Sequence, residues 1–263
     1  MLEFLKESTF KANDVFFRAL NILKKHYISV AGLCFLLFIT SNLSTFLATY
    51  LSDITGNFVK VVLLLLFVVL FFGLQLVLIK RAILLAKNVK KADIFTYIPS
   101  FKQFVNFLLG LISYSVLTGL VYLLCSIICM PLLYVGVPMD TILLEINPFI
   151  TGLAMMVILI RISFFPFFIL ENNYNLFRAG RLSLAFTKGN VTNLLALMAV
   201  LASTYVAQLA FEYLDYPILA KLSSLINTFI IIPSVSLVMA IAYVDMVKEY
   251  KGSDNPELLK NIL

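Results

Sequence analysis

Six long apolar runs constrain this chain more than any other feature. They lie near 28–51, 58–86, 105–135, 148–170, 190–213 and 222–247. A run of about 18 or more apolar residues is long enough to cross a bilayer as a helix. Lipid offers the backbone no hydrogen-bond partner, and these runs lack the alternation of barrel strands. The sequence therefore predicts an all-α, polytopic membrane helical bundle with about six spans.

Composition supports a membrane protein. Of the 263 residues, 62% are hydrophobic and 13% are charged, whereas a soluble domain is about 45–50% apolar and about 25% charged. The net charge of +6 would suggest nucleic-acid binding in a soluble protein. Here the basic residues fall between the apolar runs, and no nucleic-acid motif is present. We expect one membrane domain over residues 1–263 and no nucleic-acid partner.

The distribution of Lys and Arg predicts the orientation. Seventeen of the 20 basic residues lie before the first run, after the second and fourth runs, and in the tail. Cytoplasmic loops are enriched in Lys and Arg, so both termini are expected in the cytoplasm, with the bacterial inner membrane as the location. Residues 1–25 show no cleavable signal peptide, so the first span is expected to direct insertion.

The third run leaves the number of spans open. It is longer than one crossing requires, and Pro131 and Pro138 predict a kink or an early end. The stretch 141–147 is expected to form a short external helix. Five or seven spans are alternatives, but cytoplasmic termini at both ends require an even number.

Three similar segments predict a threefold internal repeat. Asp14, Asp93 and Asn175 are each followed by an aliphatic residue and then by phenylalanine, at spacings of about 80 residues. Asp and Asn suit a helix N-cap, because the side-chain oxygen accepts from a free backbone N–H. The expected units are approximately 8–87, 88–170 and 171–250, with 251–263 as a cytoplasmic tail. The alternative is that these are ordinary amphipathic connectors of a multipass protein.

Each of these segments has an amphipathic pattern and is expected to lie as a helix in the cytoplasmic membrane interface, in contact with lipids. In the first, polar residues from Lys11 to Lys25 step by three and four. In the second, apolar residues from Ile94 to Val105 share one side. In the third, Arg178, Arg181 and Lys188 are expected on a face opposite Phe177 and Phe186.

The stretch from Arg161 to Asn190 carries a family pattern. A span ends with an Arg–small–Pro–acid sequence, and an amphipathic helix follows that closes on a Lys-Gly turn; the residues are Arg161, Ser163, Pro166, Glu171, Arg178, Ser183 and Thr187-Lys188-Gly189-Asn190. This pattern resembles an uncharacterised bacterial six-span membrane protein family related to the membrane domain of glycerophosphodiester phosphodiesterases. The connector 86–104 is similar to the matching segment of that group. The resemblance implies six spans. It implies no phosphodiesterase activity, because the soluble catalytic domain is not expected in this chain, and it supplies no catalytic residues.

The motifs of intramembrane enzymes are missing from the sequence. His26 is the sole histidine, and neither a His-Glu-x-x-His pair nor a Gly-x-Ser-x-Gly nucleophile loop occurs. Cys34, Cys125 and Cys129 lie inside apolar runs, where free cysteine behaves as a small hydrophobe. We expect no catalytic, cofactor or metal site.

A few polar residues inside the spans are the functional candidates. Arg161 is ten positions before Glu171, about 15 Å deeper along a continuous helix. Intramembrane charges are costly and often functional. The expected partners of Arg161 are Asp245 and carbonyls freed by a Pro166 kink, with snorkelling toward the cytoplasm or a purely structural pairing as the alternative. The remaining candidates are Ser163, and Gln75 and Gln208, for which interhelical hydrogen bonds are expected.

These observations favour a non-enzymatic integral membrane protein. It would be a lipid-interacting scaffold or an accessory subunit of a membrane complex, with membrane lipids and other membrane protein subunits as partners. The alternative is a transporter or channel for a lipid or small solute, because binding sites are often at mid-membrane where helices break. An intramembrane enzyme acting on lipids is least favoured.

Overall fold

The structure is a computed structural model that describes residues 10–50, 57–89 and 94–251, and all regular elements among them are helical. The α-helices are α1 (Ala12–Tyr50), α2 (Asn57–Ala86), α3 (Ile94–Tyr97), α4 (Phe101–Cys129), α5 (Met139–Thr141), α6 (Asn147–Ile162), α7 (Phe165–Asn172), α8 (Leu176–Phe186), α9 (Val191–Tyr213), α10 (Pro217–Ile226) and α11 (Ile232–Lys251). A 3-10 helix (Met130–Val135) and two π-helical turns (Ile142–Ile146 and Asn227–Ile231) join some of them.

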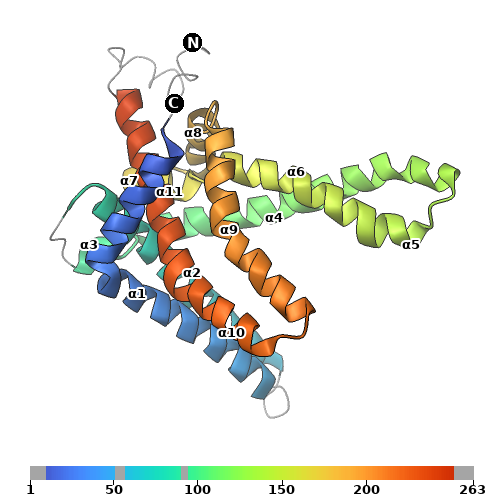
Figure 1. Cartoon of the computed structure of the whole chain (residues 1–263), viewed down its shortest axis with the longest axis horizontal. Coiled ribbons are helices and arrows are strands. Elements are labelled where there is room, and N and C mark those ends of the chain that lie inside the picture. The colour runs from blue at the N-terminus through green and yellow to red at the C-terminus, as the bar shows by residue number, and fades with distance from the viewer. Residues whose placement is uncertain (1–9, 51–56, 90–93, 252–263) are drawn as a thin grey trace.

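Six helical segments of the described chain are long and apolar enough to cross a membrane. They are Ala12–Leu43, Phe58–Ala86, Phe101–Val135, Met139–Asn172, Val191–Tyr213 and Pro217–Lys248. The prediction of an all-α multipass membrane bundle is therefore confirmed. The beginning of α1 and the end of α11 lie at the same end of the molecule, together with α7 and α8 (Figure 1). We call this the basic end, because these segments contain Arg18, Arg178, Arg181 and Lys248.

The three predicted amphipathic segments differ from one another in the structure. The first is continuous with the span that follows it, apart from non-helical dihedrals at His26 (φ −121°, ψ 19°). The second is not one helix over 94–105, because Pro99 follows α3 and Ser100 caps the start of α4. Only the third, α8, is a separate helix of more than one turn.

The three predicted N-caps have different outcomes in the structure. Asp14 lies in the first turn of α1 rather than before it, and Asn175 occupies the N-cap position of α8 without a capping bond from its side chain. Asp93 lies outside the described residues. Phe16 packs against the core, whereas Phe177 is 82% exposed. The threefold repeat thus stays a prediction.

The stretch 141–147 also differs from expectation. It is not a separate external helix, because the π-helical turn runs directly into α6. A π-helical turn likewise precedes α11, and Pro233 follows it inside the continuous helical segment Pro217–Lys248. Pro has no backbone N–H, so a helical hydrogen bond is missing at this position.

Helices α1, α2 and α11 pack together as the main bundle. Its core contains fully buried residues from all three helices, including Val15, Cys34, Leu76, Leu78 and Leu237. Tyr27 of α1 donates a hydrogen bond to the carbonyl of Phe229, just before α11, at 3.3 Å. The three cysteines are free and buried, as the sequence predicts.

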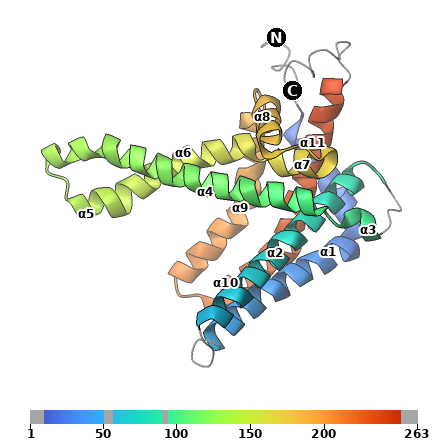
Figure 2. The same cartoon turned by 180° about the vertical axis from the view of Figure 1, so that it is seen from behind.

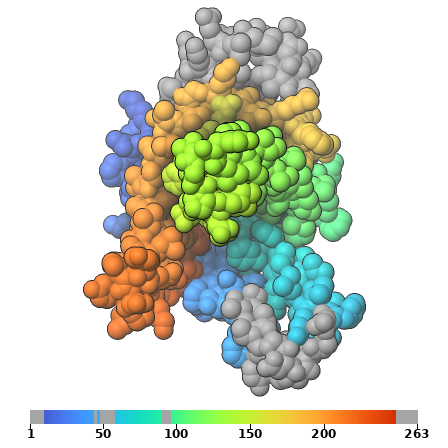
Figure 3. Space-filling model, turned by 90° about the vertical axis from the view of Figure 1, so that its right-hand side faces the viewer, coloured from blue at the N-terminus to red at the C-terminus, as the bar shows by residue number. Residues whose placement is uncertain are grey.

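Helices α4 and α6 form a hairpin that stands away from the main bundle (Figures 1 and 2). Viewed along its length, the tip of the hairpin projects in front of the rest of the molecule (Figure 3). Outside the hairpin, α4 packs mainly against α7 and α8, and α6 against α8 and α9. Its two arms are joined by polar contacts, since the side-chain amide of Asn147 in α6 donates to the Ser126 hydroxyl at 2.6 Å and to the carbonyl of Tyr122 at 3.4 Å, both in α4.

The base of this hairpin predicts a stability effect. A Cβ at Gly110 of α4 would lie 2.5 Å from Cε2 of Phe165, whereas a Cβ at Gly119 would meet nothing within 4 Å. Overpacking of this kind costs about 1–3 kcal/mol. Gly110→Leu is therefore expected to lower the melting temperature of the detergent-solubilised protein, measured by intrinsic fluorescence or light scattering. Gly119→Leu on the same helix is the matched control, and an equal loss in both variants would contradict the packing account.

Candidate functional site around the short helix α7

The helix is interrupted between α6 and α7, at a position where one continuous helical span was expected; this interruption is called the α6–α7 break. Helix α6 ends at Ile162 and α7 begins at Phe165. Such a break leaves backbone groups without helical partners, and in a membrane these must be satisfied by neighbouring groups. Ser183 and Thr187 supply the partners: both hydroxyls donate to the carbonyl of Arg161, at 2.9 and 3.1 Å, and the Ser183 hydroxyl accepts from the backbone N–H of Phe164 at 3.1 Å.

For the same reason, Arg161 has the structural pairing that was the alternative expectation, and no contact with Asp245. Because no continuous helix joins Arg161 to Glu171, the helical rise cannot place Arg161 about 15 Å deeper. Its guanidinium donates instead to the carbonyl of Leu184 in α8, at 2.8 Å. Pro166 is the second residue of α7 and is buried, and the interruption of the span Met139–Asn172 lies directly before it.

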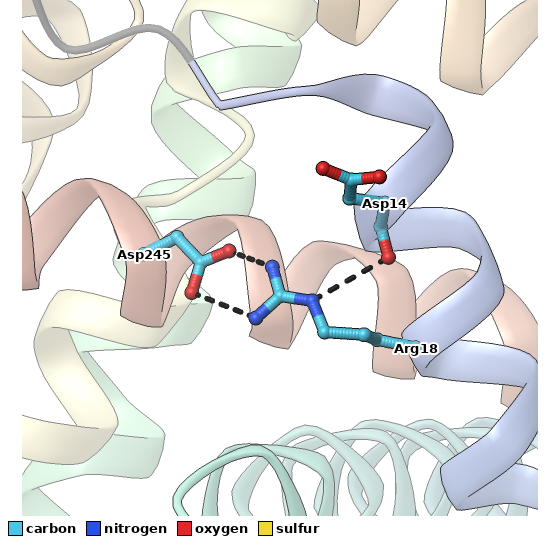
Figure 4. Close-up of polar contacts among 3 residues, drawn as sticks. All are labelled: Asp14, Arg18 and Asp245. Carbon is cyan, nitrogen blue, oxygen red and sulfur yellow. Dashed lines mark hydrogen bonds and ion pairs between the residues drawn. The ribbon is translucent and has the colours of Figure 1, made fainter.

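Asp245 does not pair with Arg161. It forms a two-pronged ion pair with Arg18 of α1, whose Nη1 donates to Asp245 Oδ1 at 3.3 Å and whose Nη2 donates to Oδ2. The Nε of Arg18 also donates to the carbonyl of Asp14 at 3.4 Å (Figure 4). This arrangement ties the beginning of α1 to the end of α11. Planar two-pronged recognition of a carboxylate is the geometry for which a guanidinium is suited.

Aromatic packing holds α7 in place. The ring of Tyr243 from α11 lies among three phenylalanines, with centroid distances of 6.3 Å to Phe164, 5.4 Å to Phe167 and 5.0 Å to Phe168. On the opposite side Phe165 stacks on Phe107 of α4, at 5.9 Å. All four phenylalanines from α7 and its N-cap are thus used to join α7 to its neighbours.

Polar contacts fix the other end of α7. Gln103 of α4 is 5% exposed, and its amide donates to the carbonyl of Leu170 at 3.0 Å and to Asn173 Oδ1 at 2.6 Å. Lys87, directly after α2, forms an ion pair with Glu171. The Tyr243 hydroxyl is buried beside Glu171 without a regular hydrogen bond. Helix α7 therefore contacts the ends of three spans as well as α8.

The remaining candidates do not join this cluster. The Ser163 hydroxyl donates to the carbonyl of Ile160 at 2.9 Å, which is a local contact. Gln75 is half-buried on α2. Gln208 of α9 accepts from Asn227, before α11, at 2.8 Å, and this confirms the interhelical hydrogen bond expected for Gln208. Of the candidates, Arg161, Ser163 and Pro166 thus lie together where α6 meets α7, whereas Gln75 and Gln208 lie elsewhere.

Sequence reasoning missed most of the residues that position α7. Gln103 carried a detectable signal, because Ser100 and Gln103 form a capping box with the Ser-x-x-Gln pattern. Lys87, Glu171 and Tyr243 carried none, since their pairing depends on which helix ends meet in space.

The outer face of α8 also differs from the prediction. Phe177 does not oppose the basic residues: it is exposed, as are Arg178, Arg181 and Leu184. Four residues at helical spacing form the buried face, namely Ala179, Leu182, Ser183 and Phe186. The guanidinium of Arg178 lies over the ring of Tyr174, at 4.3 Å. One face of α8 therefore combines large apolar side chains with positive charge.

No group of three metal-ligating side chains occurs within the described residues. Comparisons with family models, curated proteins and solved structures returned no match for this chain. The resemblance to the membrane domain of glycerophosphodiester phosphodiesterases thus stays a prediction. The arrangement around α7 consists of ion pairs, amide contacts and aromatic packing, and its chemistry is that of a junction between helices.

The Ser183 hydroxyl at the α6–α7 break yields a second prediction. Ser183→Ala would leave the Phe164 N–H and part of the Arg161 carbonyl capacity unsatisfied in a buried site, at a cost of about 1–3 kcal/mol. We expect a lower melting temperature and faster proteolysis between α6 and α8. Ser203→Ala is the control, because the exposed Ser203 donates only to the carbonyl of Val200 in its own helix. If the two variants melt alike, Ser183 does not hold the break.

Proposed function

We propose that this chain is a non-enzymatic membrane component that serves as an accessory subunit of a larger membrane complex and contacts lipid at its basic end. The observation that carries the proposal is the α4–α6 hairpin, which among the described residues packs on the rest of the chain mainly through α7, α8 and α9. Along most of its length both arms expose apolar side chains, such as Leu124, Ile128 and Phe149. These side chains suit contact with lipid or with the helices of another subunit.

Small residues on α4 favour a protein partner for part of this surface. Hydrophobic burial does not drive association between helices in lipid, so interfaces rely on close packing and are enriched in small residues spaced four apart. Ser115 and Gly119 have this spacing and are both exposed. A Cβ added at Gly119 would meet no atom of this chain within 4 Å, which leaves room for the backbone of another helix.

The contacts of Arg161 support the subunit over the transporter. The transporter hypothesis is based on an intramembrane charge near broken helices. The guanidinium of Arg161 is engaged by α8, and its carbonyl by Ser183 and Thr187. These bonds give Arg161 a structural task at the junction.

The proposal includes an orientation. Arg18, Arg178, Arg181 and Lys248 belong to segments at the basic end. By the enrichment of Lys and Arg in cytoplasmic loops, this end would face the cytoplasm at the bacterial inner membrane. Both termini would then be cytoplasmic.

Association through α4 can be tested with Gly119→Leu. Leucine would overpack a helix interface at this position, at a cost of about 1–3 kcal/mol, which corresponds to a roughly five- to 150-fold weaker association. We expect membrane proteins that co-purify with the affinity-tagged chain in mild detergent to be depleted by at least about fivefold in the variant. Quantitative mass spectrometry of matched purifications measures the change.

Two controls make this experiment decisive. Gly73→Leu replaces a glycine of α2 that also has open space around it, and it should retain the co-purifying proteins. The melting temperature of Gly119→Leu should equal that of the unmodified chain, so that depletion is not due to unfolding. The same co-purifying proteins at the same abundance in all three samples would refute association through α4.

A further inference from the structure

An open groove lies between α9 and α11, on the part of both helices that is expected within the membrane. Its volume is about 160 Å³, and its walls include Leu197, Leu201 and Tyr205 from α9 and Val235 and Val238 from α11. The Tyr205 hydroxyl is the one strongly polar side-chain group among the lining residues.

Such a groove calls for a hydrocarbon occupant. A water molecule needs two to four polar partners, and apolar cavities of about 150 Å³ stay dry. Protein interiors are closely packed, and atoms that face a void lose dispersion contacts. Because this groove is open at its side, a lipid acyl chain can enter it from the bilayer.

The charge near the groove indicates the class of lipid. The segment Leu176–Asn190 leads into α9 and contains three basic residues and no acidic one. Arg181 is exposed on α8, and Lys188 lies in the turn between α8 and α9. Leu197 is six residues after the first residue of α9, which places the top of the groove about 9 Å below that turn. The basic residues therefore lie at the level of a phospholipid headgroup, and the apolar groove lies below them at the level of its acyl chain.

We propose that the α9–α11 groove holds an acyl chain of an anionic phospholipid whose phosphate is bound by Arg181 and Lys188. The proposal rests on the membrane placement given above, but it does not depend on a partner subunit. Basic clusters beside membrane helices attract anionic headgroups, by about fivefold in affinity for each basic side chain near the surface. Phe177 and Leu184 would enter the same interface beside the headgroup.

The chain contains no tryptophan, so one introduced tryptophan reports its own surroundings. Tyr205→Trp places the reporter in the groove. Val206→Trp places it one residue further on, at nearly the same depth but at a side chain that is 63% exposed. The purified chain is placed in phosphatidylcholine vesicles. A small, increasing fraction of the lipid is then replaced either by brominated phosphatidylglycerol or by brominated phosphatidylcholine. Bromine on the acyl chains quenches tryptophan fluorescence on contact.

In the Tyr205→Trp variant, we expect brominated phosphatidylglycerol to quench the indole at a fraction at least about fivefold lower than brominated phosphatidylcholine. In the Val206→Trp variant, the two lipids should quench equally. Adding Arg181→Gln and Lys188→Gln to the Tyr205→Trp variant should abolish its preference. Met198→Trp serves as a second groove reporter if Tyr205→Trp lowers the melting temperature.

Three results would overturn the proposal. Equal quenching of the Tyr205→Trp variant by both lipids would remove the anionic preference. The same preference with the reporter at either position would indicate general enrichment around the basic end rather than a site. A preference that survives the double substitution would exclude Arg181 and Lys188 as the phosphate ligands. Because the purified chain is used alone, none of these results depends on whether α4 binds another subunit.

Discussion

The interruption of the helix between α6 and α7 is the constraint on which the rest of the structure depends. A continuous helix would carry residues 147–172 straight through the membrane. Instead the carbonyl of Arg161 is bound by two hydroxyls, those of Ser183 and Thr187, and the N–H of Phe164 is bound by the first of them. These bonds satisfy the backbone groups that the interruption of the helix would otherwise leave unpaired, in an environment that offers no water to the backbone. They also free α7 to take a new direction and to pack among the ends of other spans.

The position of α7 explains how the main bundle and the α4–α6 hairpin, which have little direct contact with each other, form one molecule. The main bundle of α1, α2 and α11 reaches α7 through Tyr243 and through Lys87. The α4–α6 hairpin reaches it through Gln103 and the Phe107–Phe165 stack. Away from this junction the hairpin packs chiefly on itself. A packed junction at one end with a largely unpartnered hairpin suits the proposed role of a subunit that contacts other membrane components, and the proposed lipid in the α9–α11 groove would lie beside that junction.

Two of the failed sequence-based predictions share one cause. Each assumes that helical spacing continues through a position where the helix is in fact interrupted. The predicted depth of Arg161 depends on its distance from Glu171 along a helix that ends at Ile162. The segment 94–105 is predicted as one helix although Pro99 interrupts it. The prediction for Phe177 fails for a different reason: Phe177 and Arg181 are four residues apart in the uninterrupted helix α8, so both lie on its exposed side. The predictions that need only composition, such as free buried cysteines, are confirmed.

The sequence by itself determined that the chain crosses a membrane about six times as helices, because run length and the lack of charge decide this locally, residue by residue. It also supplied the capping pattern at Ser100 and Gln103. Only the tertiary structure decided that Asp245 pairs with Arg18, that Arg161 binds α8, and that Tyr243 lies among the phenylalanines around α7. These partners are far apart along the chain or separated by a turn. Their contacts depend on how helix ends meet in space, which no local pattern of residues encodes.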